Sequence, residues 1–139
     1  MKKEFVTYEI DLKLKELGFD EECIGVFDRN GKISGIDFID ISNLQGINYS
    51  CISHNYPILA PLYQQAIDWI REKYNISLEI FTLSYHNSIQ YCFNIKKLED
   101  TTISVLHKGN IYYPSYYEAR EQGILKAIEL VEKNYPKHL

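Results

Sequence analysis

Two neighbouring apolar runs constrain the fold of this chain more than any other feature. Over residues 89–96, apolar and polar side chains alternate without exception, which is typical of a β-strand with one buried face. Residues 76–85 also alternate, but the apolar phase changes between Ile80 and Phe81. The short polar segment His86-Asn87-Ser88 separates the runs. The pattern predicts an antiparallel hairpin, in which a bulge or a strand covered on both faces would explain the phase change.

A capped amphipathic helix is predicted near the C-terminus. Ser115 and Glu118 have the spacing of a capping box, and Pro136 would stop the helix. Gly123 costs a helix interior about 1 kcal/mol relative to alanine, so we expect it to allow close packing against a sheet or a second subunit. The predicted buried stripe consists of Tyr117, Ile124, Leu125, Ile128, Val131 and Tyr135.

Two further helices are expected earlier in the chain. The first begins after Thr7 as a cap and ends at Leu17-Gly18-Phe19, where glycine follows the last helical residue. Alternation at residues 6–14 would also suit a strand, but the helix-forming composition favours the helix. The second helix has Pro61 in its first turn and ends at Asn75. Its predicted apolar face comprises Leu62, Ala66, Ile67, Trp69, Ile70 and Tyr74.

The remaining strands are predicted from shorter signals. Residues 23–28 and 32–33 flank Asn30-Gly31, a tight-turn pair, and predict a second hairpin. Residues 37–57 show no sustained period, with strand candidates at 35–41 and 49–53. A short strand at 102–106 precedes a turn at Gly109-Asn110.

These elements predict one α+β domain over residues 1–139. Its 139 residues, 45% hydrophobic and 24% charged, suffice for a core without metal or disulfide support. We expect a mainly antiparallel sheet of about four to six strands packed by three helices, in the order α-ββ-(β)-α-ββ-β-α.

Charge and composition exclude several classes of function. The net charge of −4 and the absence of a basic run argue against binding of a nucleic-acid polymer. Cys23, Cys51 and Cys92 form no C-x-x-C pair, and we expect reduced thiols. Neither a signal peptide nor an apolar run of bilayer-spanning length is present. The expectation is a cytoplasmic protein that does not associate with a membrane.

Residues able to carry catalysis are few. No phosphate-binding glycine loop, no metal-ligand spacing and no nucleophile motif occurs, so no catalytic residue, metal site or cofactor is predicted. His54, His86 and His107 fall on predicted loops or strand ends, and Cys51 is close to His54. A small hydrolase using one of these histidines is the least favoured of three hypotheses. Asp37 and Asp40 are interpreted as solvated surface carboxylates.

Tyrosine is the unusual component of the composition, at 12 of 139 residues. A tyrosine offers a flat apolar face and a hydroxyl group, which suits ligand and protein interfaces. Around the start of the last predicted helix, several side chains could stack on a base and meet a phosphate group. These predicted ligand-binding residues are Tyr112, Tyr113, Tyr116, Arg120, Lys108 and His86. The alternative interpretation is that the tyrosines plug the end of the core.

Three segments carry a resemblance to known sequences. They are residues 60–76, residues 116–130, and the opening Thr7-Tyr-Glu with residues 14–19. Together they resemble a group of small uncharacterised proteins encoded by bacteriophages and prophages, especially of gut Bacteroidetes. The resemblance covers most of the chain and implies a provenance, with no catalytic residues to carry over.

That provenance favours accessory or counter-defence roles. The leading hypothesis is a non-enzymatic binding protein that sequesters a small nucleotide-derived signal, with a subunit interface as a common place for such a site. The alternative is a protein–protein interaction module that inhibits a host factor through the same tyrosines. A homo-oligomer and the cytoplasm of the host cell are the corresponding expectations.

Overall fold

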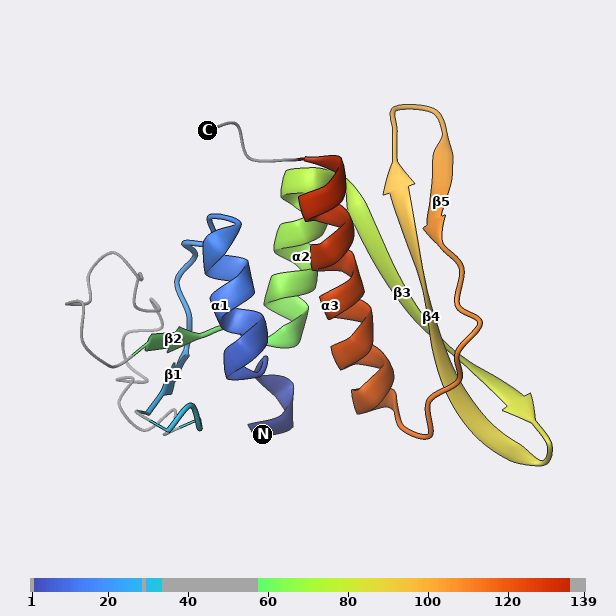
Figure 1. Cartoon of the computed structure of the whole chain (residues 1–139), viewed down its shortest axis with the longest axis horizontal. Helices are drawn as coiled ribbons and strands as arrows, with labels where there is room; N and C mark the ends of the chain where they lie inside the picture. The colour runs from blue at the N-terminus through green and yellow to red at the C-terminus, as the bar shows by residue number, and fades with distance from the viewer. Residues whose placement is uncertain (1, 29, 34–57, 136–139) are drawn as a thin grey trace. The chain divides into compact units, whose positions relative to one another are not determined.

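The computed structural model describes residues 2–28, 30–33 and 58–135 (Figure 1). In chain order the elements are η1 (Lys2–Glu4), α1 (Tyr8–Glu16), β1 (Gly25–Phe27), β2 (Ile58–Ala60), α2 (Tyr63–Tyr74), β3 (Ile76–Tyr85), β4 (Ser88–Leu98), β5 (Ile103–His107) and α3 (Tyr116–Asn134). The chain divides into two compact units, Met1–Ala66 and Ile67–Leu139, and the boundary falls inside α2. The expectation of a single domain remains a prediction.

The predicted α+β class is confirmed, with antiparallel strands and three α-helices in the described residues. The described strands form two sheets. One pairs β1 with β2, and the other has the order β3-β4-β5.

Helix α1 follows its predicted caps. The Thr7 hydroxyl accepts a hydrogen bond from the Ile10 amide at 3.3 Å. At the other end Gly18 has a φ of 97°, a conformation that glycine adopts without steric cost. The Phe19 amide donates to the Leu14 carbonyl at 3.0 Å, as expected for a Schellman motif. Local capping therefore explains why Tyr8–Glu16 is a helix although residues 6–14 alternate.

The hairpin predicted from residues 23–28 and 32–33 is present only in part. The Asp28 amide donates to the Lys32 carbonyl at 2.8 Å, and Phe27 and Ile33 form a single bridge. The strand that pairs with β1 is β2, from Ala60 opposite Gly25 to Ile58 opposite Phe27. Phe5, Phe27 and Ala60 form a buried cluster with partly buried neighbours, namely Tyr8, Ile24, Ile33 and Leu62. The strand candidates at 35–41 and 49–53, like Asp37, Asp40, Cys51 and His54, lie outside the described residues.

Helix α2 begins later than predicted. Pro61 was expected in its first turn, but the Pro61 carbonyl accepts from the Val6 amide and Leu62 forms a bridge with Phe5. These pairings with the chain near Phe5 keep both residues outside the helix, so the first helical residue is Tyr63. The end at Asn75 is confirmed, because Asn75 has a φ of 57° and its amide donates to the Arg71 carbonyl.

The β3–β4 hairpin is confirmed, and it has no bulge. The strands pair in unbroken register from Ile76 opposite Lys97 to Tyr85 opposite Ser88. His86 and Asn87 form the turn with positive φ at both positions, as the type I′ turn of a two-residue hairpin requires. The bulge, one of the two explanations offered for the phase change between Ile80 and Phe81, is therefore wrong. The one register shift that is observed lies between β4 and β5, at Ile95.

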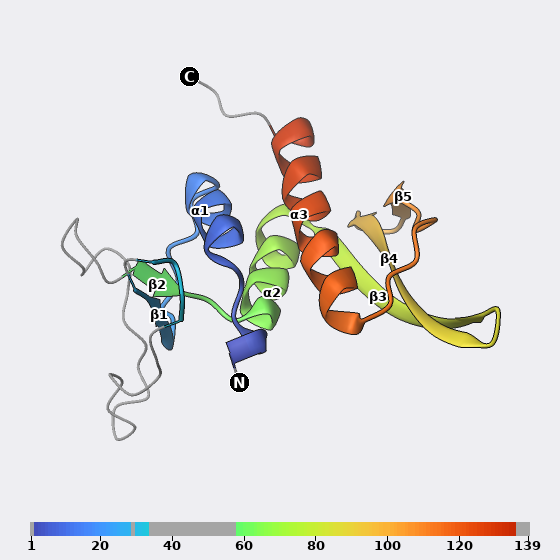
Figure 2. The ribbon, with the colours of Figure 1, turned by 60° about the horizontal axis from the view of Figure 1, so that its bottom comes forward.

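Helix α3 covers one face of the β3-β4-β5 sheet, and the hairpin extends past the first turn of the helix (Figures 1 and 2). The Ser115 hydroxyl caps the helix by accepting from the Glu118 amide at 3.2 Å. Gly123 lies against Leu78 and Phe93, where an added Cβ would be 2.9 Å from Leu78 Cδ1. The close packing that Gly123 was expected to allow is thus confirmed.

Two members of the predicted α3 stripe are exposed. Tyr117 lies in the first turn and Tyr135 caps the last, and both side chains are exposed. Both tyrosines lie at the ends of the helix, whereas Ile124, Ile128 and Val131 in its middle are fully buried. The Tyr135 ring instead packs on the Tyr74 ring at 5.3 Å.

After β5 the chain passes very close to β4 at Gly109. Gly109 lies so near the Cys92 sulfur and the Phe93 carbonyl that an added Cβ would overlap both. Its amide donates to the Asn94 side chain at 2.8 Å. Gly109 therefore allows two backbone segments to approach closely, a role that the predicted turn at Gly109-Asn110 did not include.

Candidate functional site

The register of the three-stranded sheet assigns its side chains to two faces. Residues opposite one another in an antiparallel pair share a face. Leu78 and Ile80 therefore share the face of Ile95 and Phe93, which α3 covers through Gly123. Phe81 and Tyr85 share the other face with Cys92 and Ser88.

No helix of the described part of Ile67–Leu139 covers this second face (Figure 2). Val105 pairs with Lys96 and Ile103 with Leu98, which places both on it. Val105 is 60% exposed and Ile103 64%. We call this surface the open sheet face and define it by its exposed apolar side chains, Phe81, Tyr85, Ile103, Val105 and Tyr112. One ion pair crosses it, between Lys96 and Glu79 at 2.9 Å.

The tyrosines before α3 are divided between the two faces. Tyr113 exchanges backbone hydrogen bonds with Tyr91 at 2.8 and 2.9 Å, and its ring stacks on Phe93 at 6.1 Å. Burial raises the pKa of the Tyr113 hydroxyl, and the nearby Cys92 adds to this. Tyr112 instead contacts Tyr85, with ring centroids 5.1 Å apart. Because successive residues of extended chain point to opposite faces, Tyr112 and Tyr113 do not line one site.

A second aromatic group lies at the start of α3. The Arg120 guanidinium carbon is 5.4 Å from the ring centroids of both Tyr116 and Tyr117, within range for cation–π attraction. Tyr91 meets Tyr116 edge-on at 6.2 Å. Arg120 is only 5% exposed, whereas Tyr116 and Tyr117 are exposed. We call these four residues the arginine cluster.

The two other predicted ligand residues lie apart from the arginine cluster. His86 is in the hairpin turn with its ring 4.2 Å from that of Tyr85. Lys108 is exposed on the segment after β5. Of the six predicted residues, Tyr116 and Arg120 belong to the arginine cluster, Tyr112 and His86 both contact Tyr85, Tyr113 stacks on Phe93, and Lys108 is exposed after β5. His107, considered as a catalytic residue, stacks on Phe93 at 5.1 Å.

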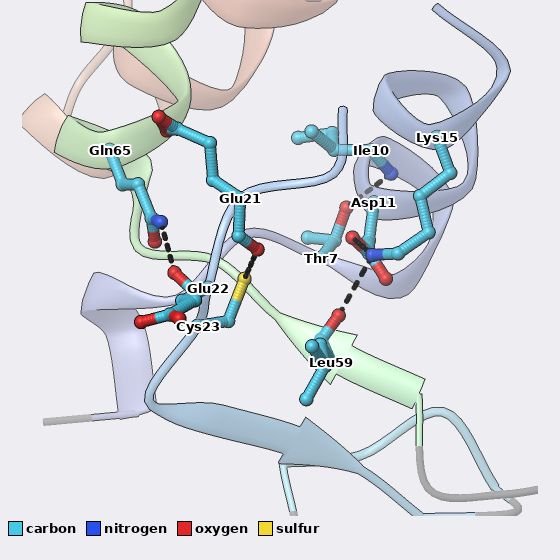
Figure 3. A network of polar contacts seen from close by, with 9 residues as sticks. All are labelled: Thr7, Ile10, Asp11, Lys15, Glu21, Glu22, Cys23, Leu59 and Gln65. Carbon is cyan, nitrogen blue, oxygen red and sulfur yellow. Dashed lines mark hydrogen bonds and ion pairs between the residues drawn. The ribbon is translucent and has the colours of Figure 1, made fainter. Parts of the chain in front are cut away.

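A polar network joins α1 to the chain around it within Met1–Ala66 (Figure 3). The Lys15 ammonium pairs with the Asp11 carboxylate and donates to the Leu59 carbonyl at 3.0 Å. Burial raises the pKa of Asp11 to about 6, although Lys15 opposes the shift. Gln65 donates to the Glu22 carbonyl at 2.6 Å. These bonds link α1 to β2, and the start of α2 to the segment that follows α1.

The described cysteines do not resemble nucleophiles. Cys23 and Cys92 are both free and buried. Burial raises the pKa of the Cys23 thiol to about 12, so the thiolate needed for attack is not populated near neutral pH. Cys23 donates to the Glu21 carbonyl at 3.4 Å (Figure 3), and Cys92 to the Ile111 carbonyl at 3.3 Å.

Two other features are absent from residues 2–28, 30–33 and 58–135. No group of three or more histidine, cysteine, aspartate or glutamate side chains is placed to hold a metal ion there. None of the helices in the same residues has the length and apolar character needed to span a membrane.

The open sheet face includes residues that the sequence reasoning did not single out. The sequence predicts Phe81, Ile103 and Val105 only as strand residues, since local alternation does not tell which face of a sheet will be covered. The phase change at Phe81 was the available signal. Where the apolar phase shifts inside an unbroken strand, as it does here, apolar side chains occur on both faces of the sheet.

Comparison of the chain with protein-family models, with curated proteins and with solved structures finds no match.

Proposed function

We propose that this chain is a non-enzymatic binding protein that engages a partner protein through the open sheet face. The observation that carries the proposal is the gathering of Phe81, Tyr85, Ile103, Val105 and Tyr112 on one face, all exposed. Exposed apolar side chains that gather on one face of a protein are a recurring mark of interaction sites. Aromatic side chains are also enriched at protein interfaces.

The resemblance to phage and prophage proteins supports a host protein as the partner. An accessory or counter-defence factor without catalytic machinery acts by occupying a host protein, and an apolar surface crossed by one ion pair suits a protein partner. Inhibition of a host factor in the cytoplasm is therefore the role that we assign to the chain.

The test is capture of a partner from host lysate with a matched pair of variants. Val105→Lys places a charge on the open sheet face. Ile89→Lys places the same charge on the α3-facing side, at a residue that is 66% exposed. We expect the unmodified chain and Ile89→Lys to retain one stoichiometric protein that Val105→Lys loses. Retention of nothing, or equal loss in both variants, would contradict the proposal.

Sequestration of a small nucleotide-derived signal is the second candidate, and the arginine cluster supports it. A buried guanidinium between two exposed tyrosine rings combines a fixed positive charge with surfaces on which a base can stack. It ranks second because Tyr112, His86 and Lys108 lie away from Arg120.

Nucleotide release from the purified chain tests the second candidate. The protein is incubated with cell extract, washed and denatured, and the released small molecules are identified by mass spectrometry. An intact nucleotide, absent from Tyr116→Ala and present in the control Tyr135→Ala, would support sequestration. Release of none would exclude it, and release of an altered nucleotide would favour a hydrolase.

A further inference from the structure

Strand β3 is an edge strand of the β3-β4-β5 sheet. One side of it pairs with β4 through all ten residues from Ile76 to Tyr85. The backbone of Tyr91 is hydrogen-bonded to Tyr113, on the side of β4 away from β3. Tyr91 is opposite Thr82, so in an antiparallel pair the Thr82 N–H and C=O also point outward, away from β4.

The same alternation assigns the other outward-pointing groups. They belong to Leu78, Ile80 and Ser84, which share the phase of Thr82. No hydrogen bond to these outward backbone groups occurs among the residues that the structure describes. The outer edge of β3 is therefore a row of available donors and acceptors.

This edge lacks the features that usually prevent pairing with another strand. Natural edge strands carry lysine, proline or a bulge, or are very short. The sequence of β3, ISLEIFTLSY, has no proline and no basic residue, and its register with β4 has no shift. Its single charged residue, Glu79, is paired with Lys96 of the neighbouring strand.

We propose that a second copy of this chain pairs antiparallel with the outer edge of β3, with the two-fold axis at Phe81. In this register Ile80 lies opposite Thr82 of the partner subunit, and Leu78 lies opposite Ser84 of the partner subunit. All four residues have outward-pointing backbone groups, so each pair exchanges two hydrogen bonds. The two three-stranded sheets become one continuous sheet.

The side chains of β3 suit a second copy of the same strand. Phe81 meets the partner subunit's Phe81, and exposed aromatic pairs across strands are stabilising. Glu79 meets the partner subunit's Leu83, so no like charges face each other. The overlap runs over residues 77–85 of both strands, which is nearly the whole of β3. The dimer also joins the two open sheet faces into a single larger surface.

The mass of the full chain in solution tests the proposal with the variant Thr82→Pro. Proline removes the Thr82 N–H, which points outward, so the β3–β4 pairing remains intact. We expect the unmodified chain to have twice the monomer mass by light scattering, and Thr82→Pro to be a folded monomer. Thr82→Lys, which adds a protective charge to the edge, is expected to do the same and replaces the proline variant if that variant does not fold. Ile89→Lys, on β4, is the control that stays dimeric.

Amide hydrogen exchange identifies the surface that pairs. The Ile80 and Thr82 amides should be protected in the dimer and should lose that protection at least tenfold in Thr82→Lys. A monomer at all accessible concentrations would overturn the proposal. So would a dimer that persists in the folded edge variants, or one in which the Ile80 and Thr82 amides exchange freely.

Discussion

Asp11 combines complete burial with an ion pair on the same helix. Its carboxylate contacts Lys15, and Lys15 also donates to the Leu59 carbonyl. Burial has a larger effect on the pKa of Asp11 than Lys15 has, because the pKa is raised from 3.8 to about 6. A carboxyl whose pKa is higher in the folded chain stabilises the fold in its protonated form.

The pH dependence of stability should therefore carry a contribution from Asp11. Between about pH 4 and pH 6 the folded chain holds a proton that the unfolded chain has released. The free energy of unfolding should fall as the pH rises through this window, by roughly 3 kcal/mol at most. Urea unfolding of the unmodified chain and of Asp11→Asn, compared at pH 4 and pH 7, measures it.

The exposed ion pair of Asp68 with Arg71 supplies the control. Asp68→Asn should leave the pH dependence of the unmodified chain in place, whereas Asp11→Asn should reduce it. Equal pH dependence in the unmodified chain and Asp11→Asn would show that Asp11 does not titrate as described.

Gly109 permits a backbone crossing that no other residue allows. A Cβ at this position would overlap both the Cys92 sulfur and the Phe93 carbonyl. Gly109→Ala should lower the free energy of unfolding by about 1–3 kcal/mol, the usual cost of overpacking. Thermal unfolding measures the loss. Asn110→Ala, at the exposed neighbouring residue, should have little effect, and a Gly109→Ala variant as stable as that control would contradict the close approach.

At the scale of the elements, α1 and α3 begin with the same kind of side-chain N-cap. Thr7 caps α1 and Ser115 caps α3, each by accepting from the amide three residues later. Thr7→Ala and Ser115→Ala should each lower the free energy of unfolding by about 1 kcal/mol. Replacement by asparagine, which also caps, should restore most of the stability. Chemical denaturation that shows no loss in the alanine variants would contradict the capping role.

Local chemistry made most elements predictable. The caps at Thr7 and Ser115, the end at Asn75 and the turn at His86-Asn87 depend on residues within a few positions of one another. The pairing of β1 with β2 joins strands more than thirty residues apart, and no local signal specifies it. The start of α2 was wrong for the same reason, because distant Phe5 and Val6 bind the backbone of Leu62 and Pro61.

At the scale of the whole molecule, the candidate surfaces were less predictable than the fold. The sequence directed attention to Tyr112, Tyr113, Tyr116 and Arg120, of which Tyr112 and Tyr116 are exposed, Tyr113 is half-buried and Arg120 is buried. Their division between two faces follows from the bridge of Tyr113 to Tyr91, a tertiary contact. The open sheet face also combines residues from β3, β5 and the segment before α3, which come together only in the folded sheet.

The most direct test of the account is hydroxyl-radical footprinting of the chain in host lysate, compared with the purified chain. The two candidate surfaces carry different aromatic probes, with Phe81, Tyr85 and Tyr112 on the open sheet face and Tyr116 and Tyr117 in the arginine cluster. We expect lysate to protect the first three side chains and leave the last two reactive. Protection confined to Tyr116 and Tyr117, or protection of neither group, would contradict the assignment of the open sheet face as the binding surface.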